Sequence, residues 1–296
     1  LQTVRRAISF GTSRHEHGSR SSPRGDSCSG MPQKGPITMT ERQPLLGIDV
    51  GGSEIKFALV DVQNGQLVQE RQAIATPSGF GVSEMTHAIL GVARDLAPNA
   101  PVGIGMPAVV HQGRVLSPPT AHEFGGWVGR DFAEALSEQH GAPVRVGNDA
   151  DVAGLAEMAF GAGRDRSGVV LVLTLGTGIG SALFNDGVLV PNTELGKLYL
   201  ESSEIVAEHY VASRVKTDLG LSWDEWSARL ARYLEQVDRL FCPELVILGG
   251  GISHEADRFL PRLSIRGEIR AAKLGNDAGI IGAARLVCES GTNERA

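Results

Sequence analysis

Two stretches of the chain share one pattern, in which a buried strand runs into a glycine-rich loop and then into a second strand. The first is LLGIDVGGSEIK at 45–56, and the second is VVLVLTLGTGIG at 169–180. Apolar runs of this length suit buried strands, and glycine lets the backbone turn tightly with its N–H groups facing outward. One such loop alone is equally compatible with an ordinary hairpin turn. Two of them, on two similar halves, predict a cleft between domains that holds a phosphate donor from both sides.

The order of elements around the first loop indicates an α/β protein. After the first strand we expect strands at 57–62 and 67–74, a helix at 82–96 and a strand at 102–106. This order opens an actin-like or ribonuclease-H-like domain. We therefore predict a two-domain α/β fold of that class, with the active-site cleft between the domains. The smaller domain is expected at 44–147, completed by a C-terminal helix at 278–288, and the larger one at 148–277.

The second half continues with helices and a third glycine loop. Helices are predicted at 131–139, 152–160, 207–216 and 223–241, a hairpin turn at 185–187, and a strand from 245 that ends in Gly249-Gly250-Gly251. Helix 223–241 is amphipathic. Its expected buried face consists of Trp226, Leu230, Tyr233, Leu234, Val237 and Leu240. We assign these aromatic residues to the core rather than to a binding surface.

Charge, cysteines and hydropathy exclude several classes of protein. The net charge of −6 gives no support for nucleic-acid binding. No apolar run approaches the ~20 residues of a membrane span. Cys28, Cys242 and Cys288 are odd in number and far apart, so they indicate neither a disulfide framework nor a zinc motif. We therefore expect a cytoplasmic protein in a reducing compartment.

The first 43 residues differ from the rest of the chain. They contain seven Lys and Arg residues and three Asp and Glu residues, which gives this segment a charge of +4. Because the whole chain has a net charge of −6, the remainder carries −10. The segment is rich in Ser, Arg, Gly and His and has no hydrophobic periodicity, so we expect it to be disordered. Its composition has some features of a transit peptide. An over-long translation start is the favoured interpretation, because Met31 and Met39 lie just before the first strand.

The glycine loops supply the predicted donor-binding residues. Backbone N–H groups and hydroxyls in such loops suit a phosphate chain, and the sequence lacks the Gly-Lys-Ser/Thr ending of a Walker motif. The predicted phosphate-donor residues are Asp49, Gly51, Gly52, Ser53, Lys56, Thr174, Gly176, Thr177, Gly178, Gly249, Gly250 and Gly251. Asp49 lies where the first strand ends, so it is also the predicted metal residue, holding the ion through water.

Acidic residues in the second half predict the chemistry of the acceptor. Asp149 follows a short apolar strand, at the kind of strand end where ligands of α/β sheets bind. A carboxylate there can take a proton from an attacking hydroxyl. The alternative is that Asp149 and Asp151 cap the following helix, and for Asp151 we expect capping. Asn148 is expected to orient a polyol hydroxyl, and Glu194 to accept hydrogen bonds from sugar hydroxyls unless it is simply a solvated loop acid.

Five motifs occur in the order DVGG at 49–52, GNDA at 147–150, LGTGIG at 175–180, TELG at 193–196 and LGGG at 248–251. Together they resemble the ROK family of sugar kinases and regulators. The sequence lacks the Cys-rich zinc motif of that family and contains PNTELG at 191–196 and LSWDEW at 221–226, and these features resemble its polyphosphate-dependent glucokinase branch in particular. The resemblance implies a two-domain actin-like fold, usually a homodimer, that phosphorylates the 6-hydroxyl of glucose. It implies Asp149 as general base, Asn148 and Glu194 as glucose ligands, and Asp49 near Mg²⁺. Donor phosphates would be held by Gly51, Gly52, Thr177 and Gly178.

The sequence departs from the family pattern near Glu194. Lys197 stands where the family usually has His, and Tyr199 replaces an expected Glu, with Glu201 nearby. Lys197 either adds positive charge for a polyanion or disturbs the sugar site. A basic track for polyphosphate would draw on Lys56, Lys197, Arg214 and Lys216, which are otherwise solvated charges.

The resulting prediction is an enzyme, a glucokinase that uses polyphosphate and also ATP, with glucose as acceptor and Lys197 among the substrate-binding residues. Two alternatives stay open. One is an ATP-dependent hexokinase for another hexose such as mannose. The other is a sugar-binding pseudo-kinase or sensor, although the N-terminal segment has no helix-turn-helix pattern.

Overall fold

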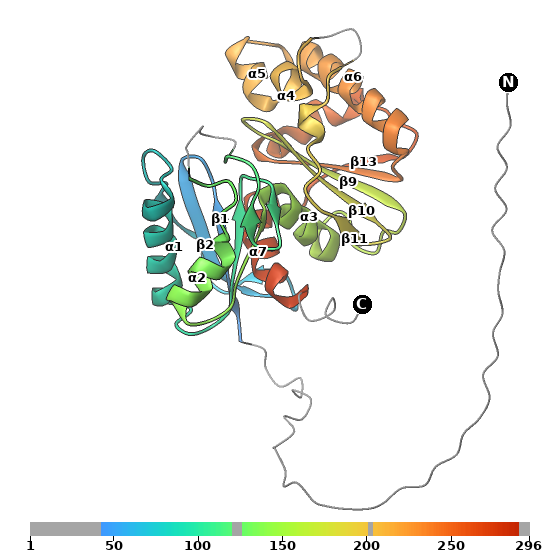
Figure 1. Ribbon diagram of the computed structural model, residues 1–296. Coiled ribbons are helices and arrows are strands. Elements are labelled where there is room, and N and C mark those ends of the chain that lie inside the picture. Colours follow the sequence, from blue (N-terminus) through green and yellow to red (C-terminus); the bar gives the residue numbers. More distant parts are fainter. Residues whose placement is uncertain (1–42, 120–125, 201–203, 290–296) are drawn as a thin grey trace, which may run out of the picture. The chain divides into compact units, whose positions relative to one another are not determined.

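The computed structural model describes residues 43–119, 126–200 and 204–289 (Figure 1). The predictions for the segment before residue 43 and for Glu201 lie outside the described residues. No helix in the described part of the chain is both long and apolar enough to cross a membrane. The domain boundaries given above stay a prediction.

The first sheet is built around β1 (Leu45–Val50), which contains the first predicted strand. Its order is β3-β2-β1-β5-β8, and β4 also pairs with β2. The other strands are β2 (Glu54–Asp61), β3 (Gln66–Leu67), β4 (Gln72–Ala75), β5 (Val102–Met106) and β8 (Val144–Asn148). β1 is antiparallel to β2 and parallel to β5, and β5 is parallel to β8. The carboxyl ends of β1, β5 and β8 therefore lie at one edge of the sheet.

The single strand predicted at 67–74 is wrong, because two short strands occupy this stretch. Leu67 lies opposite Val60 of β2, and Gln72 lies opposite Phe57. The five steps along the chain from Leu67 to Gln72 thus match the three steps from Val60 back to Phe57 in β2, so two extra residues form a bulge between β3 and β4. A bulge leaves the composition of the stretch unchanged, so the sequence alone predicts one continuous strand.

Helices α1 (Val82–Leu96) and α2 (Phe132–His140) belong to the core of the first sheet. α1 has the predicted bounds. α2 is capped by Asp131, whose side chain accepts a hydrogen bond from Glu134 N, and it ends at Gly141 with φ 78°. Between them lies the hairpin of β6 (Val110–His111) and β7 (Arg114–Val115).

The second sheet repeats the plan of the first around the second glycine loop. Its order is β11-β10-β9-β12-β13. The strands are β9 (Val169–Leu175), β10 (Ile179–Asn185), β11 (Val188–Val190), β12 (Leu245–Gly249) and β13 (Glu268–Ala271). The turn between β10 and β11 has φ 50° at Asp186 and 79° at Gly187, which confirms the predicted hairpin. β9 is antiparallel to β10 and parallel to β12, so two glycine loops emerge at the same edge.

Helices α3 (Asp149–Phe160) and α7 (Ala278–Glu289) pack tightly against each other (Figure 1). α7 lies against the first sheet, and α3 also contacts β9 and β10 of the second sheet. A Cβ atom on Gly282 of α7 would lie 1.6 Å from the carbonyl oxygen of Val152 in α3. A Cβ atom on Gly103 of β5 would lie 1.7 Å from the carbonyl oxygen of Ala283. Only glycine permits these approaches. They place the start of α3 beside the end of β1.

The remaining helices cover the second sheet. They are α4 (Ala207–Val211), α5 (Ser213–Asp218) and α6 (Trp223–Phe241), with 3₁₀ turns η1 (Leu195–Lys197), η2 (Gly251–Arg258), η3 (Leu260–Arg262) and η4 (Gly275–Asp277). α6 has the predicted bounds and begins with a capping box of Ser222 and Glu225.

Two predictions about these helices are wrong. The helix at 207–216 is broken, because Ala212 has an extended ψ of 154° and separates α4 from α5. Leu240 is 58% exposed, whereas the other five residues of the predicted α6 face are buried. Leu240 lies in the last turn at the margin of the apolar stripe, where the helix ends.

Candidate active site

Asp49 and Asp149 meet at the edge where the strands of the first sheet end. Asp49 lies next to the end of β1, and Asp149 begins α3 directly after β8. β5 lies between them, with Gly105 opposite Asp49. A Cβ atom at Gly105 would lie 3.8 Å from Asp49 Oδ1 and 3.6 Å from Asp149 Cα. Two carboxylates from sequence positions one hundred residues apart thus flank the same position of the sheet.

The environment of Asp149 raises the pKa of its carboxyl to about 7. Burial is the main cause, because an ionised carboxylate loses hydration inside the protein. The negative charge of Asp49 adds to the rise, and those of Glu194 and Asp151 contribute less. A hydrogen bond from Ala150 N to Asp149 Oδ1, 2.8 Å, lowers the pKa. A carboxylate with a pKa near neutrality suits a general base.

Asn148, and not Asp151, caps the helix that carries Asp149. Asn148 Oδ1 accepts hydrogen bonds from Ala150 N at 2.9 Å and Asp151 N at 3.0 Å. Its Nδ2 donates to the carbonyl oxygen of Ala108 at 3.1 Å. The prediction that Asp151 caps the helix is therefore wrong: the helix starts at Asp149, so Asp151 lies inside its first turn. Of the polar groups of Asn148, one amide hydrogen is left for a ligand.

A cavity of about 220 Å³ is lined by both acids and by the third glycine loop, whereas the residues at 51–53 and 176–178 do not line it. Its walls include Asp49, Lys56, Asp149, Thr174, Gly249, Gly250 and Gly251. Lys56 lies opposite Asp49 in the β1–β2 register. The pKa of Asp49 is raised by burial, and the positive charge of Lys56 lowers it. The structure thus brings the first strand and the third glycine loop to one site.

The first two glycine loops use some of their own N–H groups. Gly51 N donates to the carbonyl oxygen of Glu54 at 2.9 Å, and Gly176 N donates to that of Gly178 at 3.0 Å. These two N–H groups close the turns and are not directed at a ligand. Gly52, Ser53 and Thr177 are exposed. Those three residues are therefore the better placed of the predicted phosphate contacts.

The third glycine loop lies against the end of β9. Gly250 has φ 81°, and a Cβ atom there would lie 2.5 Å from the carbonyl oxygen of Leu175. Both the backbone angle and the close approach require glycine. The loop at 249–251 is thereby held beside the loop at 175–178.

Glu208 is a charged residue of this region that sequence reasoning missed. Its carboxylate forms an ion pair with Lys197 Nζ, and its Oε1 lies 3.6 Å from His209 Nε2. A Cβ atom on Gly178 would lie 2.9 Å from Glu208 Oε2, so this side chain borders the second glycine loop. Glu194 is affected by both charges. Burial is the main cause that raises the pKa of Glu194, the positive charge of Lys197 lowers it, and the negative charge of Glu208 raises it further. Lys197 is therefore a charge-compensated residue beside two acids.

Asn192 is a second residue that the sequence did not reveal. Its side-chain amide pairs with the backbone of Val110 in β6: Oδ1 accepts from Val110 N and Nδ2 donates to Val110 O, both at 2.9 Å. Its own N–H donates to Asp151 Oδ2 at 2.8 Å. Asn192 has φ 61°, a conformation that Asn tolerates better than most residues. The chain two residues before Glu194 is thus bonded to both β6 and α3.

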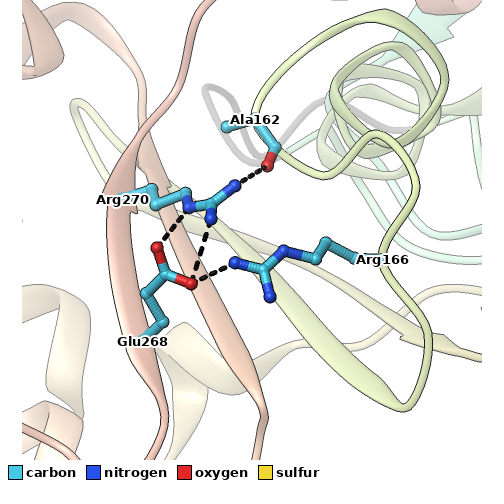
Figure 2. A network of polar contacts seen from close by, with 4 residues as sticks. All are labelled: Ala162, Arg166, Glu268 and Arg270. Carbon is cyan, nitrogen blue, oxygen red and sulfur yellow. Dashed lines mark hydrogen bonds and ion pairs between the residues drawn. The ribbon is translucent and has the colours of Figure 1, made fainter.

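The far end of α3 is held by polar contacts to β13 and the segment after it. Glu157 accepts hydrogen bonds from Ala162 N at 2.8 Å, Lys273 N at 2.9 Å and Leu274 N at 2.8 Å. Figure 2 shows the neighbouring network, in which Glu268 bonds both Arg166 and Arg270. Arg270 also donates to Ala162 O at 3.2 Å. The helix that begins with Asp149 is therefore fixed at both ends.

Comparisons with known proteins agree with this architecture. A polyphosphate glucokinase of Mycobacterium leprae (strain TN) is 41% identical over 246 residues, which cover 83% of this chain and 75% of that protein. One from Mycobacterium tuberculosis (strain ATCC 25618 / H37Rv) is 39% identical over 250 residues, covering 84% and 92%. The crystal structure of an inorganic polyphosphate/ATP-glucomannokinase from Arthrobacter sp. strain KM is 43% identical. It covers 84% of this chain and 100% of that one, with a TM-score of 0.78.

These similarities confirm the predicted fold class, the two-domain actin-like fold of sugar kinases. The family model of ROK matches residues 45–204, which include the first two glycine loops, Asp149 and Glu194. The resemblance read from the five motifs is thus confirmed, and the chain belongs to the ROK family.

Proposed function

We propose that the protein transfers the terminal phosphoryl group of inorganic polyphosphate to the 6-hydroxyl of glucose. The observation that carries the proposal is Asp149, a carboxylate with a pKa of about 7 in a cavity shared with Thr174 and the third glycine loop. The names of the mycobacterial relatives support both substrates. The intact base also argues against a catalytically inactive sugar sensor.

In the proposed reaction, Asp149 accepts the proton of the 6-hydroxyl as the sugar oxygen attacks the terminal phosphorus. The new O–P bond forms while the bridging P–O bond breaks, and polyphosphate leaves one unit shorter. The protein contributes mainly positioning and charge compensation. We assign Asn148 and Glu194 to the sugar. Lys197 acts there through Glu208, whose charge it balances.

Residues at the donor side fit a divalent cation held largely by the donor itself. No group of three or more His, Cys, Asp or Glu that could hold a metal occurs in the described residues. Mg²⁺ is commonly bound by one or two carboxylates, water and substrate phosphates, and Asp49 would be its carboxylate here. The ion, when bound, neutralises charge on the phosphates. Gly52, Ser53, Lys56, Thr177 and Gly178 would contact the donor.

A second donor and a second sugar are part of the proposal. The Arthrobacter structure is that of a polyphosphate/ATP-glucomannokinase, and its 43% identity supports ATP as an alternative donor and mannose as an alternative acceptor. Kinetics with both sugars and both donors on one preparation will rank them.

Assembly and location are also proposed. We infer a homodimer, supported by the edge strand β11, where Val188 is 69% and Val190 43% exposed. Light scattering at micromolar concentration tests it. We infer a cytoplasmic protein, supported by the free thiols of Cys242 and Cys288.

The decisive experiment replaces Asp149 by Asn, which keeps the size of the side chain and removes the base. Turnover of glucose with polyphosphate should fall about a hundred- to ten-thousand-fold. Asp165→Asn, at an exposed aspartate, is the matched control and should retain turnover. Full activity of Asp149→Asn would overturn the assignment of the base. Wild-type protein that phosphorylates no hexose with either donor would overturn the function.

A further inference from the structure

A second cavity, of about 420 Å³, adjoins the donor loops on the side of the second sheet. Its walls include Gly176, Thr177, Arg214, Lys216, Trp223 and Gly251. Gly251 also lines the cavity that contains Asp149. The third glycine loop is therefore a wall common to both cavities. A linear ligand with its reacting end at Asp149 can continue past this loop into the second cavity.

Helix α5 is attached directly to the second glycine loop. Ser213 Oγ donates to the carbonyl oxygen of Gly176 at 2.8 Å, and Arg214 N donates to the same oxygen at 3.2 Å. The side chains of Arg214 and Lys216 are thereby held beside the loop that is proposed to bind the donor. Their position is set by the backbone and not by a mobile linker.

The charges around the second cavity are only partly compensated. Arg214 Nε lies 3.8 Å from Asp218 Oδ2, and Arg258 Nε lies 3.5 Å from Glu255 Oε2. No carboxylate of the described residues forms an ion pair with Lys216. Its Nζ instead lies 4.3 Å from the centre of the Trp223 ring. Lys216 is therefore the cation of this cavity that is free to pair with an anionic ligand.

The surroundings of Trp223 favour an anion over a nucleobase. Its ring centre lies 6.0 Å from that of Phe259, nearly parallel, and 5.9 Å from that of Trp226. Lys216 Nζ lies over the ring, and Arg258 Cζ is 5.5 Å from its centre. An indole already in contact with two aromatic rings and two cations offers little surface for stacking a base. It does present positive charge to whatever enters the cavity.

We propose that this second cavity binds the distal phosphates of an extended polyphosphate donor, with Lys216 as a contact and Arg214 beside it. The inference rests on the function proposed above and adds a subsite to it. Each unit of polyphosphate carries charge, so phosphates beyond the reacting end gain ionic contacts with cations along their path. Longer chains should therefore bind better than short ones.

The test compares long-chain polyphosphate with tripolyphosphate on Lys216→Gln, Lys216→Arg and wild type. KM is measured for each donor, and binding is measured by calorimetry without sugar. In Lys216→Gln the ratio of long-chain KM to tripolyphosphate KM should rise about three- to fivefold, as expected for one exposed ion pair. Lys216→Arg should restore the ratio. Arg145→Gln, at an exposed cation of β8, is the matched control and should keep the wild-type ratio.

Three results would overturn the subsite. The ratio could stay at its wild-type value in Lys216→Gln, or both polyphosphate lengths could weaken by the same factor. Lys216→Gln could also weaken ATP as much as long-chain polyphosphate, which would assign the cavity to the nucleoside. Each of these leaves wild-type sugar phosphorylation intact. If wild type turned over no polyphosphate, the proposed function would fail, and the calorimetric comparison would still decide on the subsite.

Discussion

The two ends of helix α3 each carry a carboxylate that lines the same cavity, and they are built in opposite ways. Glu157 is 1% exposed and accepts three backbone hydrogen bonds from Ala162, Lys273 and Leu274. Asp149 accepts one backbone hydrogen bond, from the residue next to it. It also faces the negative charges of Asp49, Glu194 and Asp151.

The difference separates a structural carboxylate from a reactive one. A buried carboxylate that accepts several N–H groups is held in place by them and has few lone pairs left for a ligand. One with a single donor keeps an oxygen for the substrate, and the acidic neighbours of Asp149 help to raise its pKa. In the same helix, therefore, one acid holds the chain together and the other is set up to take a proton.

The comparison predicts that Asp149→Asn loses turnover and keeps stability, whereas Glu157→Ala loses stability. Asp149→Asn should lose about a hundred- to ten-thousand-fold in turnover but should not lose stability. Because the pKa of Asp149 rises from 3.8 to about 7 on folding, its ionisation destabilises the folded state as pH rises through that range. Denaturant unfolding should find Asp149→Asn more stable than wild type above pH 7 and equal to it below pH 3.8. A less stable variant at pH 8 would contradict the account.

The reverse is expected of Glu157. Glu157→Ala leaves three backbone N–H groups without an acceptor, so the free energy of unfolding should fall by about 3 kcal/mol. Glu138→Ala, at an exposed position of α2, is the control and should change it by about 0.5 kcal/mol or less. Urea titrations followed by circular dichroism measure both. Unchanged stability of Glu157→Ala would show that water replaces the carboxylate.

The pH dependence of the reaction sharpens the assignment of the proton acceptor. A base with a pKa of about 7 must be ionised to act, so kcat/KM should fall about tenfold per pH unit below that value. Asp151 also has a pKa raised to about 7, by burial above all. Asp151→Asn distinguishes the two acids. It removes a negative charge near Asp149, so the pH at which kcat/KM is half-maximal should decrease slightly, while kcat/KM should still fall at lower pH. Loss of the acid limb in Asp151→Asn would assign the limb to Asp151.

The sequence predicted the parts of this site that depend on local patterns. Apolar runs ending in glycine located the loops at 51–53, 176–178 and 249–251, and periodicity gave α6 its bounds. It did not predict the contacts that distinguish Asp149 from Glu157. Lys273 and Leu274, which bond Glu157 just before η4, lie 116 and 117 residues away, and no local pattern encodes such a pairing. The cap was missed because Asn148, Asp149 and Asp151 are all residues that cap helices well.

The smallest expected effect concerns Asn192, which links Glu194 to both β6 and α3. Its positive φ complicates an alanine substitution, because alanine is strained in that conformation and glycine is not. Asn192→Gly therefore removes the two side-chain bonds to Val110 with little backbone strain, and should cost about 1 kcal/mol of stability. Since the loop before Glu194 loses its attachment, KM for glucose should rise several-fold more than kcat falls. Gln72→Ala, at an exposed position of β4, is the control. If Asn192→Gly lowered kcat and left KM unchanged, Asn192 would position the base through Asp151 and not the sugar through Glu194.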